Sequence, residues 1–492
     1  MTRVAYGITT PAYNSDPPFH PGQRFPELPF VEPGDRLNPP YELLRSLLHR
    51  LGLDRQNFGT PRWNPLGHII RPGQTVLLKP NFVTSLNGSG DDIFAVVTHP
   101  SILRALVDYT YRALEGQGRI IIADAPDMSC QWEDLMAVQR LDAIQQWYQE
   151  RRHFTVEYHD LRNFAMRDPH QLPYAGNRVS RPGDPEGHTV INLGRQSAFF
   201  GLPSENYYGA DYDRTETIRH HHDETHEYCI SNSFLHADVI LSVPKMKVHK
   251  KVGVTLNLKG LVGANTNKNY LIHYRVGSPA QSGDQLPDDI SSGDQFKVRV
   301  QRWLFDHALA RQSRAGDLVY STFRGLYRCL IKPWRPVSQQ TRIFDGGNWH
   351  GNDSAWRMTS DLAKILFFAD AKGVLQSSRQ RAVFCVVDGI MAGVREGPLA
   401  PTAKACGCLV MGENPFAVDL VTTRLMGFNH RKIRQFDVMS DPRWDFGLRS
   451  ADAVEVLGPE GETAGREFFA QDNHEPHFAF EPHPGWVGHI EI

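Results

Sequence analysis

Residues 238–263 read DVILSVPKMKVHKKVGVTLNLKGLVG, and this stretch joins an apolar, strand-like run to a lysine-rich turn and a helix-like segment. Seven lysines and arginines lie between Asp238 and the next carboxylate, Asp284, where the composition of the chain predicts about five carboxylates. A local excess of positive charge beside the end of a strand indicates an anion site. A solvated basic face and a nucleic-acid contact are the alternatives, although few aromatic residues alternate with the lysines.

The pairing of an apolar run with a polar end recurs along the chain. Strands are predicted at 74–78, 118–123, 154–158, 239–243, 382–387 and 407–411. Helices are predicted around them at 41–51, 100–114, 132–151, 357–375 and 416–426. Continuous apolar strands that alternate with helices are typical of an α/β fold. They favour a mostly parallel, Rossmann-like layered sheet with helices on both faces.

Interruptions of this alternation predict the domain organisation. The proline-rich residues 1–40 predict an extended N-terminal arm, residues 41–460 an α/β domain, and residues 461–492 an irregular C-terminal tail. Two polar, loop-rich insertions, at about 162–236 and 265–350, are expected to form a cap over the strand ends.

The overall composition narrows the class of protein. With 492 residues, of which 40% are hydrophobic and 22% charged, the chain is typical of a large globular protein. Its net charge of −2 gives no general bias toward nucleic acid. The sequence contains no run of about 18 apolar residues, so we expect no membrane span, and we expect no secretion signal. Six scattered cysteines predict free thiols in a reducing compartment, the cytoplasm, and no iron–sulfur cluster.

Candidate anion-binding residues follow from the predicted sheet, because ligands of parallel α/β sheets bind outside the carboxyl ends of the strands. The predicted anion ligands are Lys79, Asn81, Lys245, Lys247 and Lys259. Lys245 and Lys247 are two residues apart, so an extended backbone would place both on one face. The helix-like segment 254–262 would point its N-terminal amides at the same space. Polar residues that only end strands and cap helices are the alternative explanation.

Candidate catalytic residues come from the same strand ends and from the lysine-rich stretch. Asp124 and Asp388 would act as general base or hold a divalent cation, and His249 and His273 would transfer protons. Two glycine-containing loops, 345–353 and 388–398, would either fold over a ligand or form ordinary turns.

A histidine-rich run, 220–226, reads HHHDETH and is a candidate metal site. On a helix, His222 and His226 would share a face, as two metal ligands do. The predicted metal ligands are therefore His222 and His226, together with Asp124 and Asp388 where a cation is held at the strand ends. A polar surface or an anion-facing histidine cluster is the alternative.

Six motifs in the chain resemble, in the same order, those of the family known as domain of unknown function 362. They are KPNF (79–82), ADAP (123–126), the run 237–263, GNWHGNDSAWRMTSDLAKIL (347–366), VVDGIMAG with GPLAP (386–401), and GENPFAVDLVTTRLMG (412–427). The resemblance covers about residues 74–430. It implies an α/β domain that is often encoded near genes for cell-surface polysaccharides or fused to ferredoxin modules.

This chain lacks ferredoxin cysteines and is therefore similar to the stand-alone long branch of that family. That branch typically has a Trp-Leu-Pro-His-His run after the lysine segment. Here residues 270–274 read YLIHY, so any role of the second histidine is lost or altered.

These features predict an enzyme that acts on a small anionic substrate at the strand ends. The substrate would be phosphorylated or carboxylated, with a sugar derivative as one option, and the chemistry general acid/base or metal-assisted. The alternative is a non-catalytic binding protein for an anionic glycan or nucleotide in a surface-polysaccharide or biosynthetic pathway. No nucleic-acid partner is expected. The reaction type, the metal and a possible oligomer stay open.

Overall fold

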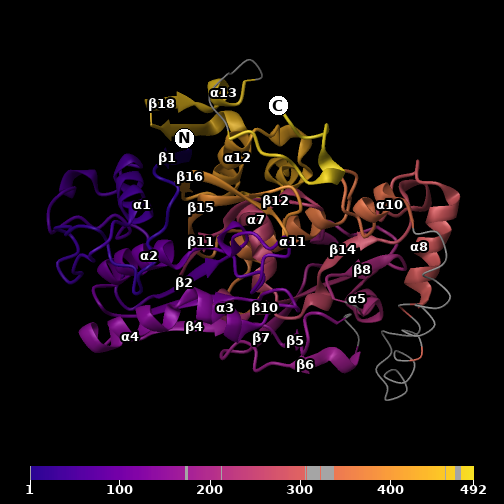
Figure 1. Ribbon diagram of the computed structural model, residues 1–492, viewed down its shortest axis with the longest axis horizontal. Helices are drawn as coiled ribbons and strands as arrows, with labels where there is room; N and C mark the ends of the chain where they lie inside the picture. Colours follow the sequence, from indigo (N-terminus) through magenta and orange to yellow (C-terminus); the bar gives the residue numbers. More distant parts are fainter. Residues whose placement is uncertain are drawn as a thin grey trace.

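A large mixed sheet forms the centre of the computed structural model (Figure 1). The structure describes residues 2–171, 175–211, 213–304, 306, 322, 337–459, 461–470 and 478–492. The strands follow the order β18-β17-β1-β16-β15-β11-β2-β3-β4, with β12 beside β15 and β13 beside β12. Their bounds are β1 Thr2–Ile8, β2 Thr75–Pro80, β3 Arg119–Asp124, β4 Val156–Asp160, β11 Val239–Val243, β12 Lys245–His249, β13 Gly253–Val254, β15 Ala382–Val394, β16 Thr402–Gly412, β17 Val454–Gly458 and β18 Gly461–Ala464.

The middle of this sheet is parallel, as the apolar runs predict. Strands β4, β3, β2, β11 and β15 run in the same direction, so their carboxyl ends meet at one edge. Strand β16 runs antiparallel to both β15 and β1. The residue after it, Asn414, therefore belongs to the opposite edge, where it caps a helix by accepting from the amides of Phe416 and Ala417. The sequence could not distinguish this strand from its parallel neighbours, because both kinds are equally apolar.

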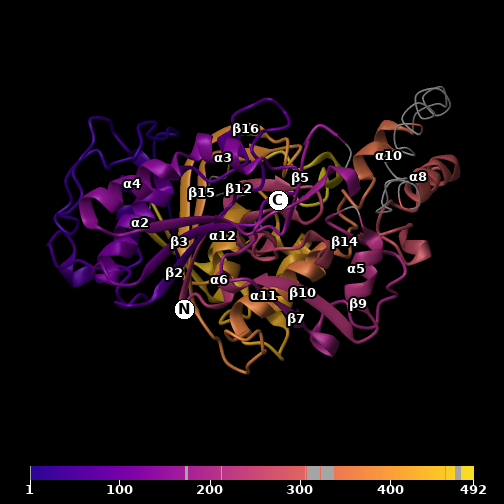
Figure 2. The same ribbon diagram turned by 90° about the horizontal axis from the view of Figure 1, so that it is seen from below.

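Helices cover both faces of the sheet (Figure 2). On one face lie α1 (Pro39–Arg50), α2 (Pro100–Leu114), α3 (Trp132–Gln139) and α4 (Leu141–Arg152). On the other lie α6 (Asn232–Leu235), α7 (Leu256–Gly260), α11 (Ala355–Phe368) and α12 (Pro415–Met426). Alternate residues of one strand enter different cores, so Val76 and Leu78 pack on the first side and Leu77 on the second.

Some predicted boundaries differ from the structure for local reasons. The single helix predicted at 132–151 is two helices, because Arg140 between them has a left-handed backbone with φ 49°. The helix predicted at 357–375 ends at Phe368. Part of the segment 1–40, predicted as an extended arm, is strand β1, which lies inside the sheet between β16 and β17. Likewise β18 and α13 (Gly465–Phe468) belong to the segment predicted as an irregular tail.

The two insertions form a cap of small sheets and short helices at one side of the molecule (Figure 1). The first contains β5 Phe164–Met166, β6 Arg178–Ser180, β7 His188–Asn192, β8 Tyr207–Gly209, α5 Arg214–His220, β9 His221–His222 and β10 Thr225–Ser231. The second contains β14 Ile272–Arg275, α8 Ser292–Leu304 and α10 Gln339–Phe344. The antiparallel pair β14–β8 joins the two insertions to each other. Among the described residues, no helix combines the length and apolar character needed to cross a bilayer.

Candidate functional site

A cavity of about 230 Å³ lies where the carboxyl ends of β2 and β3 meet β12, helix α7 and the cap. Six lysines line it, so we call it the lysine cavity: Lys79, Lys247, Lys250, Lys251, Lys259 and Lys268. Asn81, Asp124, Asp127, His249 and His273 also line it. The sheet edge expected from the strand order therefore holds a cavity with a large excess of cationic side chains.

Four of these lysines are already held by protein oxygens. Lys268 donates to the carbonyls of Ala125, Val262 and Asn265 at 2.7, 3.2 and 3.1 Å, which occupies its three N–H groups. Lys247 donates to the Val96 and Pro398 carbonyls and lies 3.5 Å from Asn81 Oδ1. These two ammonium groups are fixed in the wall of the cavity, with no N–H left for a ligand.

Lys79 and Lys251 each have two partners. Lys79 Nζ lies 3.0 Å from Asp124 Oδ1 and donates to the Pro80 carbonyl at 2.9 Å. Lys251 donates to the Gly346 carbonyl and to Asn348 Oδ1. Each ammonium therefore keeps one N–H for a ligand.

Lys250 and Lys259 are different, because neither Nζ has a hydrogen-bond or ion-pair partner in the part of the chain that the structure describes. Lys259 lies in α7 and its side chain is buried, with 7% of the residue exposed. Burial and the nearby Lys268 lower the pKa of Lys259 to about 7. A buried cation without a counter-ion is costly, so these two groups are the ones that an anion would stabilise.

The two histidines have opposite hydrogen-bonding roles. His249 Nδ1 accepts from the backbone amide of Lys251 at 3.0 Å, so its neutral ring carries the proton on Nε2. His273 Nδ1 lies 3.1 Å from the Leu271 carbonyl and must donate to it, so its Nε2 has the free lone pair. Burial, and then the charge of Lys259, hold the pKa of both rings well below the usual value. Both histidines are therefore neutral at pH 7, one presenting a donor and the other an acceptor.

Asp124 is held by close packing as well as by charge. Its Oδ2 accepts from the Phe82 amide at 2.7 Å while its Oδ1 faces Lys79. A Cβ on Gly263 would lie 1.7 Å from Asp124 Oδ1 and 2.7 Å from Lys79 Nζ. Only glycine fits at 263, because the backbone of the lysine-rich stretch passes directly over this ion pair.

Lys245 and Asp388 are not brought to the lysine cavity. They pair at 2.9 Å and are completely buried. The two oxygens of Asp388 also accept from Tyr13 Oη, the amide of His99 and the amide of Ile390. The ladder between β12 and β15 is irregular between Lys245 and Lys247, so the two lysines do not share one environment. The expected convergence of Asp124, Lys245 and Asp388 on one cavity is therefore not observed.

The N-terminus of α7 does not face a ligand either. The amides of Asn257 and Leu258 both donate to the carboxylate of Asp419, at 2.9 Å each. Asp419 is completely buried, and burial raises its pKa to about 7. The expectation that these amides add to the anion site is wrong, because a side chain of α12 already occupies them.

The histidine run forms a hairpin and not a helix. His226 in β10 is paired with His221, whereas His222 in β9 is paired with Thr225, so the side chains of His222 and His226 point to opposite faces. His226 is buried, and the side chain of His222 is 44% exposed. The helical spacing expected for two metal ligands is therefore wrong. Within the described ranges, no three His, Cys, Asp or Glu residues gather in a group that could hold a metal ion.

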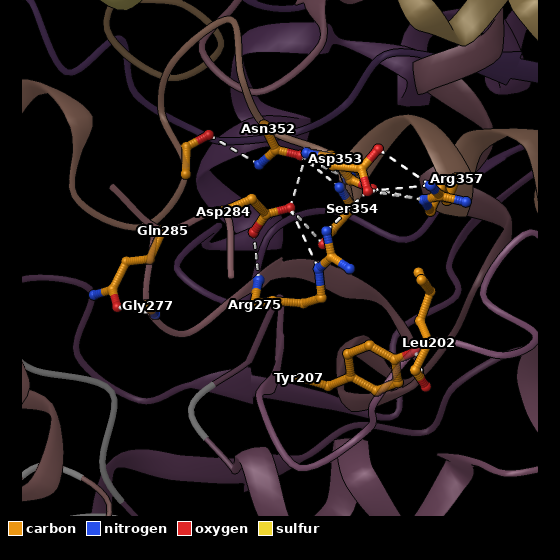
Figure 3. A network of polar contacts seen from close by, with 12 residues as sticks. Leu202, Tyr207, Arg275, Gly277, Asp284, Gln285, Asn352, Asp353, Ser354 and Arg357 are labelled. Carbon is orange, nitrogen blue, oxygen red and sulfur yellow. Dashed lines mark hydrogen bonds and ion pairs between the residues drawn. The ribbon is translucent and has the colours of Figure 1, made fainter. Parts of the chain in front are cut away.

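A polar network around Asp284, drawn in Figure 3, lies in the cap. It supports β14, the strand that carries His273 and Tyr274. Asp284 accepts from the Arg275 amide at 2.5 Å, from the Asp353 amide at 2.8 Å and from Ser354 Oγ at 2.7 Å. Asn352, at the end of the glycine-containing loop 345–353, donates to the His273 carbonyl at 3.1 Å. This loop thus holds the histidine strand in place.

Residues 388–394 of the second stretch predicted as a loop are the end of strand β15, and Pro398 and Leu399 beyond it line the lysine cavity. A Cβ on Gly397 would lie 2.2 Å from the Val248 carbonyl, so the chain there passes close to β12. This contact brings the Pro398 carbonyl to Lys247.

Three lysines that line the cavity, Lys250, Lys251 and Lys268, are not among the anion ligands predicted from the sequence. The lysines belong to the charge excess between Asp238 and Asp284, and that excess was the available signal. Tyr274 stands at the altered position of the YLIHY run, and its buried hydroxyl has no partner among the described residues.

The chain has little detectable similarity to known proteins. No curated protein matches the chain. A crystal structure of a protein from Thermotoga maritima, solved by the Northeast Structural Genomics Consortium, matches with 11% identity and a TM-score of 0.26. That match covers 75% of this chain and 55% of the other. The model of the family described as "Domain of unknown function (DUF362)" matches residues 173–424, which include β12, α7 and β14. The protein therefore belongs to the family of domain of unknown function 362.

Proposed function

We propose that the protein is an enzyme that binds a small phosphorylated or carboxylated substrate in the lysine cavity. It would catalyse a reaction in which protons move between this substrate and side chains of the cavity. The observation that carries this proposal is the combination of two free ammonium groups, Lys250 and Lys259, with two neutral histidines of opposite tautomer in one cavity. The anionic group would bind Lys250 and Lys259, with the remaining N–H groups of Lys79 and Lys251 as further donors.

The histidines supply the acid/base part of this proposal. His273 Nε2 would accept a proton from the substrate, and His249 Nε2–H would donate a hydrogen bond to a developing oxyanion. Neutral rings suit these roles, because a histidine that is already protonated cannot act as a base.

The size of the cavity favours a small substrate. Its volume of about 230 Å³ is below the range of about 300–1,000 Å³ in which larger ligands bind. A non-catalytic binding protein for an anionic glycan or a nucleotide would need more room or a cavity that remains open at one side. Such a binding protein would hold its ligand tightly and never convert it.

A divalent cation is not needed to balance the charge in this proposal. Asp388 is saturated by protein donors, and Asp124 faces Lys79. The lysines provide the positive charge instead. We expect anion binding to be unchanged by a chelator such as EDTA.

Isothermal titration calorimetry with sulfate tests the anion site, because the charge of sulfate is constant between pH 6 and pH 9. Lys259→Met is expected to weaken sulfate binding at pH 6 at least tenfold, and Lys372→Met, at an exposed lysine, to leave it unchanged. In the unmodified protein, affinity should fall from pH 6 to pH 9, since Lys259, with a pKa of about 7, loses its charge over this range. Equal affinity of Lys259→Met and the unmodified protein would overturn the proposal.

Catalysis is tested separately. The protein is incubated with a mixture of small phosphorylated and carboxylated metabolites, and NMR follows the loss of each compound. His273→Gln is expected to abolish turnover and to keep sulfate binding. A compound that binds tightly but is never converted would favour the binding protein.

A further inference from the structure

Lys259 combines a mostly cationic surrounding with an Nζ that has no partner in the described part of the chain. The charges that act on its pKa are those of Lys268, Asp127, Lys250 and Lys79, and three of these four are cations. No carboxylate contacts it in the described part of the chain. Lys250, the other free lysine, is less exposed to cations: burial lowers its pKa, but the charges of Asp127 and Glu396 act in the opposite direction and favour its ammonium form.

A lysine that is buried beside other cations is the type that acts as an amine nucleophile. Burial and Lys268 lower the pKa of Lys259 to about 7. Near neutral pH, the amine of Lys259 is therefore uncharged in about half of the protein molecules. The free lone pair faces the same cavity as His249 and His273. Of the neighbouring charges, that of Lys259 lowers the pKa of both histidines the most.

We propose that Lys259 forms an imine with an aldehyde or ketone group of the substrate, which would make that substrate a small oxo acid or a phosphorylated aldehyde or ketone. This inference rests on the proposed function and refines it. When a carbonyl substrate is bound, Lys250, Lys79 and Lys251 hold its anionic group and the uncharged amine of Lys259 reacts, whereas sulfate, which has no carbonyl group, is held by protonated Lys259 as well. The inference names the reactive residue and the class of substrate.

The chemical step balances without an added reagent. The Nζ lone pair attacks the carbonyl carbon, a C–N bond forms, and the C=O electron pair moves to oxygen, where His249 Nε2–H donates a hydrogen bond. His273 Nε2 takes a proton from the attacking nitrogen and passes it to that oxygen, which gives a carbinolamine. The second nitrogen proton is transferred in the same way as the C–O bond breaks. The products are an imine and one water molecule, and both histidines end neutral.

Reductive trapping tests this inference. The full-length protein is incubated with sodium cyanoborohydride and either pyruvate or glycolaldehyde phosphate, and peptide mass spectrometry locates the adduct. We expect modification at Lys259 at least tenfold above any other lysine, and its loss in Lys259→Arg. Lys372→Met should be modified like the unmodified protein. The rate should rise from pH 6 to pH 8, as the amine of Lys259 loses its proton.

A second variant separates chemistry from folding. His273→Gln should slow trapping at least tenfold and leave sulfate affinity unchanged, because it removes the proton acceptor and no ammonium group. Sulfate binding without an adduct at Lys259 would overturn the imine and leave the proposed function standing. Absence of both would overturn both. Adducts spread evenly over surface lysines would also overturn the inference.

Discussion

At the scale of single residues, the hydrogen-bond partners of each lysine decide what that lysine can do. Lys268 and Lys247 have their N–H groups occupied by protein oxygens, whereas Lys259 has none occupied in the described part of the chain. Partners offset the cost of burying a charge, whereas a charge that is buried and free costs free energy until a ligand binds. Lys259 therefore lowers the free energy of unfolding of the ligand-free protein.

This cost can be measured. Lys259→Met should raise the free energy of unfolding at pH 6 by on the order of 2–4 kcal/mol, because it removes an unpaired buried cation. The pKa of Lys259 is about 7 in the folded protein and near the usual value of 10.5 when unfolded. The unfolded chain thus binds the proton more tightly between these values, and the cost of keeping lysine shrinks as pH rises toward 10.

Urea denaturation at pH 6 and pH 9 checks this prediction, with Lys372→Met as the control that should change neither value. A loss of stability in Lys259→Met at pH 6 would contradict it. That result would mean that Lys259 has a compensating partner in the folded protein.

At the scale of elements, the short strand β14 depends on the cap network for its position. Four residues of the chain hold it from outside the strand: Asp284 through the Arg275 amide, Asn352 through the His273 carbonyl, and Asp353 and Ser354 through Asp284 (Figure 3). A strand of four residues gains little from its own ladder with β8, so these contacts fix the direction of His273.

Asp284→Asn tests this dependence. An amide group would present N–H donors where Asp284 now accepts, so at least one of three hydrogen bonds is lost in a buried position. We expect the free energy of unfolding to fall by about 2–3 kcal/mol and the catalytic rate to fall more than sulfate affinity, because His273 moves and the lysines do not. Asp289→Asn, at an exposed aspartate, is the control for both measurements. Unchanged stability would show that β14 is held by other contacts.

At the scale of the whole molecule, a buried network joins the N-terminal segment to the central strands. Tyr13 Oη donates to Asp388 Oδ1 at 2.7 Å and accepts from Lys245 Nζ at 2.7 Å and from the Met391 amide at 3.1 Å. The Tyr13 ring stacks on His99 at 3.9 Å, and the His99 amide donates to the other oxygen of Asp388. Segments from four parts of the sequence thus meet around one ion pair.

Tyr13→Phe tests whether this network is structural. It leaves Lys245 and the Met391 amide each without one partner, so the free energy of unfolding should fall by about 2–3 kcal/mol, as measured by urea denaturation. Sulfate affinity should be unchanged, because Lys245 and Asp388 do not line the lysine cavity. Tyr158→Phe is the matched control, since its hydroxyl has no partner among the described residues. A large change in sulfate affinity would restore Lys245 and Asp388 as candidates for the site.

Local sequence alone was sufficient for the fold class and for bringing most of the candidate residues together at one cavity. Apolar runs predict buried parallel strands because a strand covered on both faces must be apolar throughout, as at 239–243. The charge excess after this strand predicts an anion site, and Lys79, Asn81, Asp124, Lys247, Lys259, His249 and His273 all line one cavity. Periodicity and charge are local properties, so they can be read without knowing what the chain contacts elsewhere.

The tertiary structure decided which of these residues are free to meet a ligand. Lys245 and Lys259 look alike in sequence, yet one is paired with Asp388, 143 positions away, and the other has no partner in the described chain. The amides of α7 are occupied by Asp419, and His222 and His226 are separated by a hairpin. Whether a polar group is saturated depends on atoms from distant segments, and no local pattern in the sequence records those contacts.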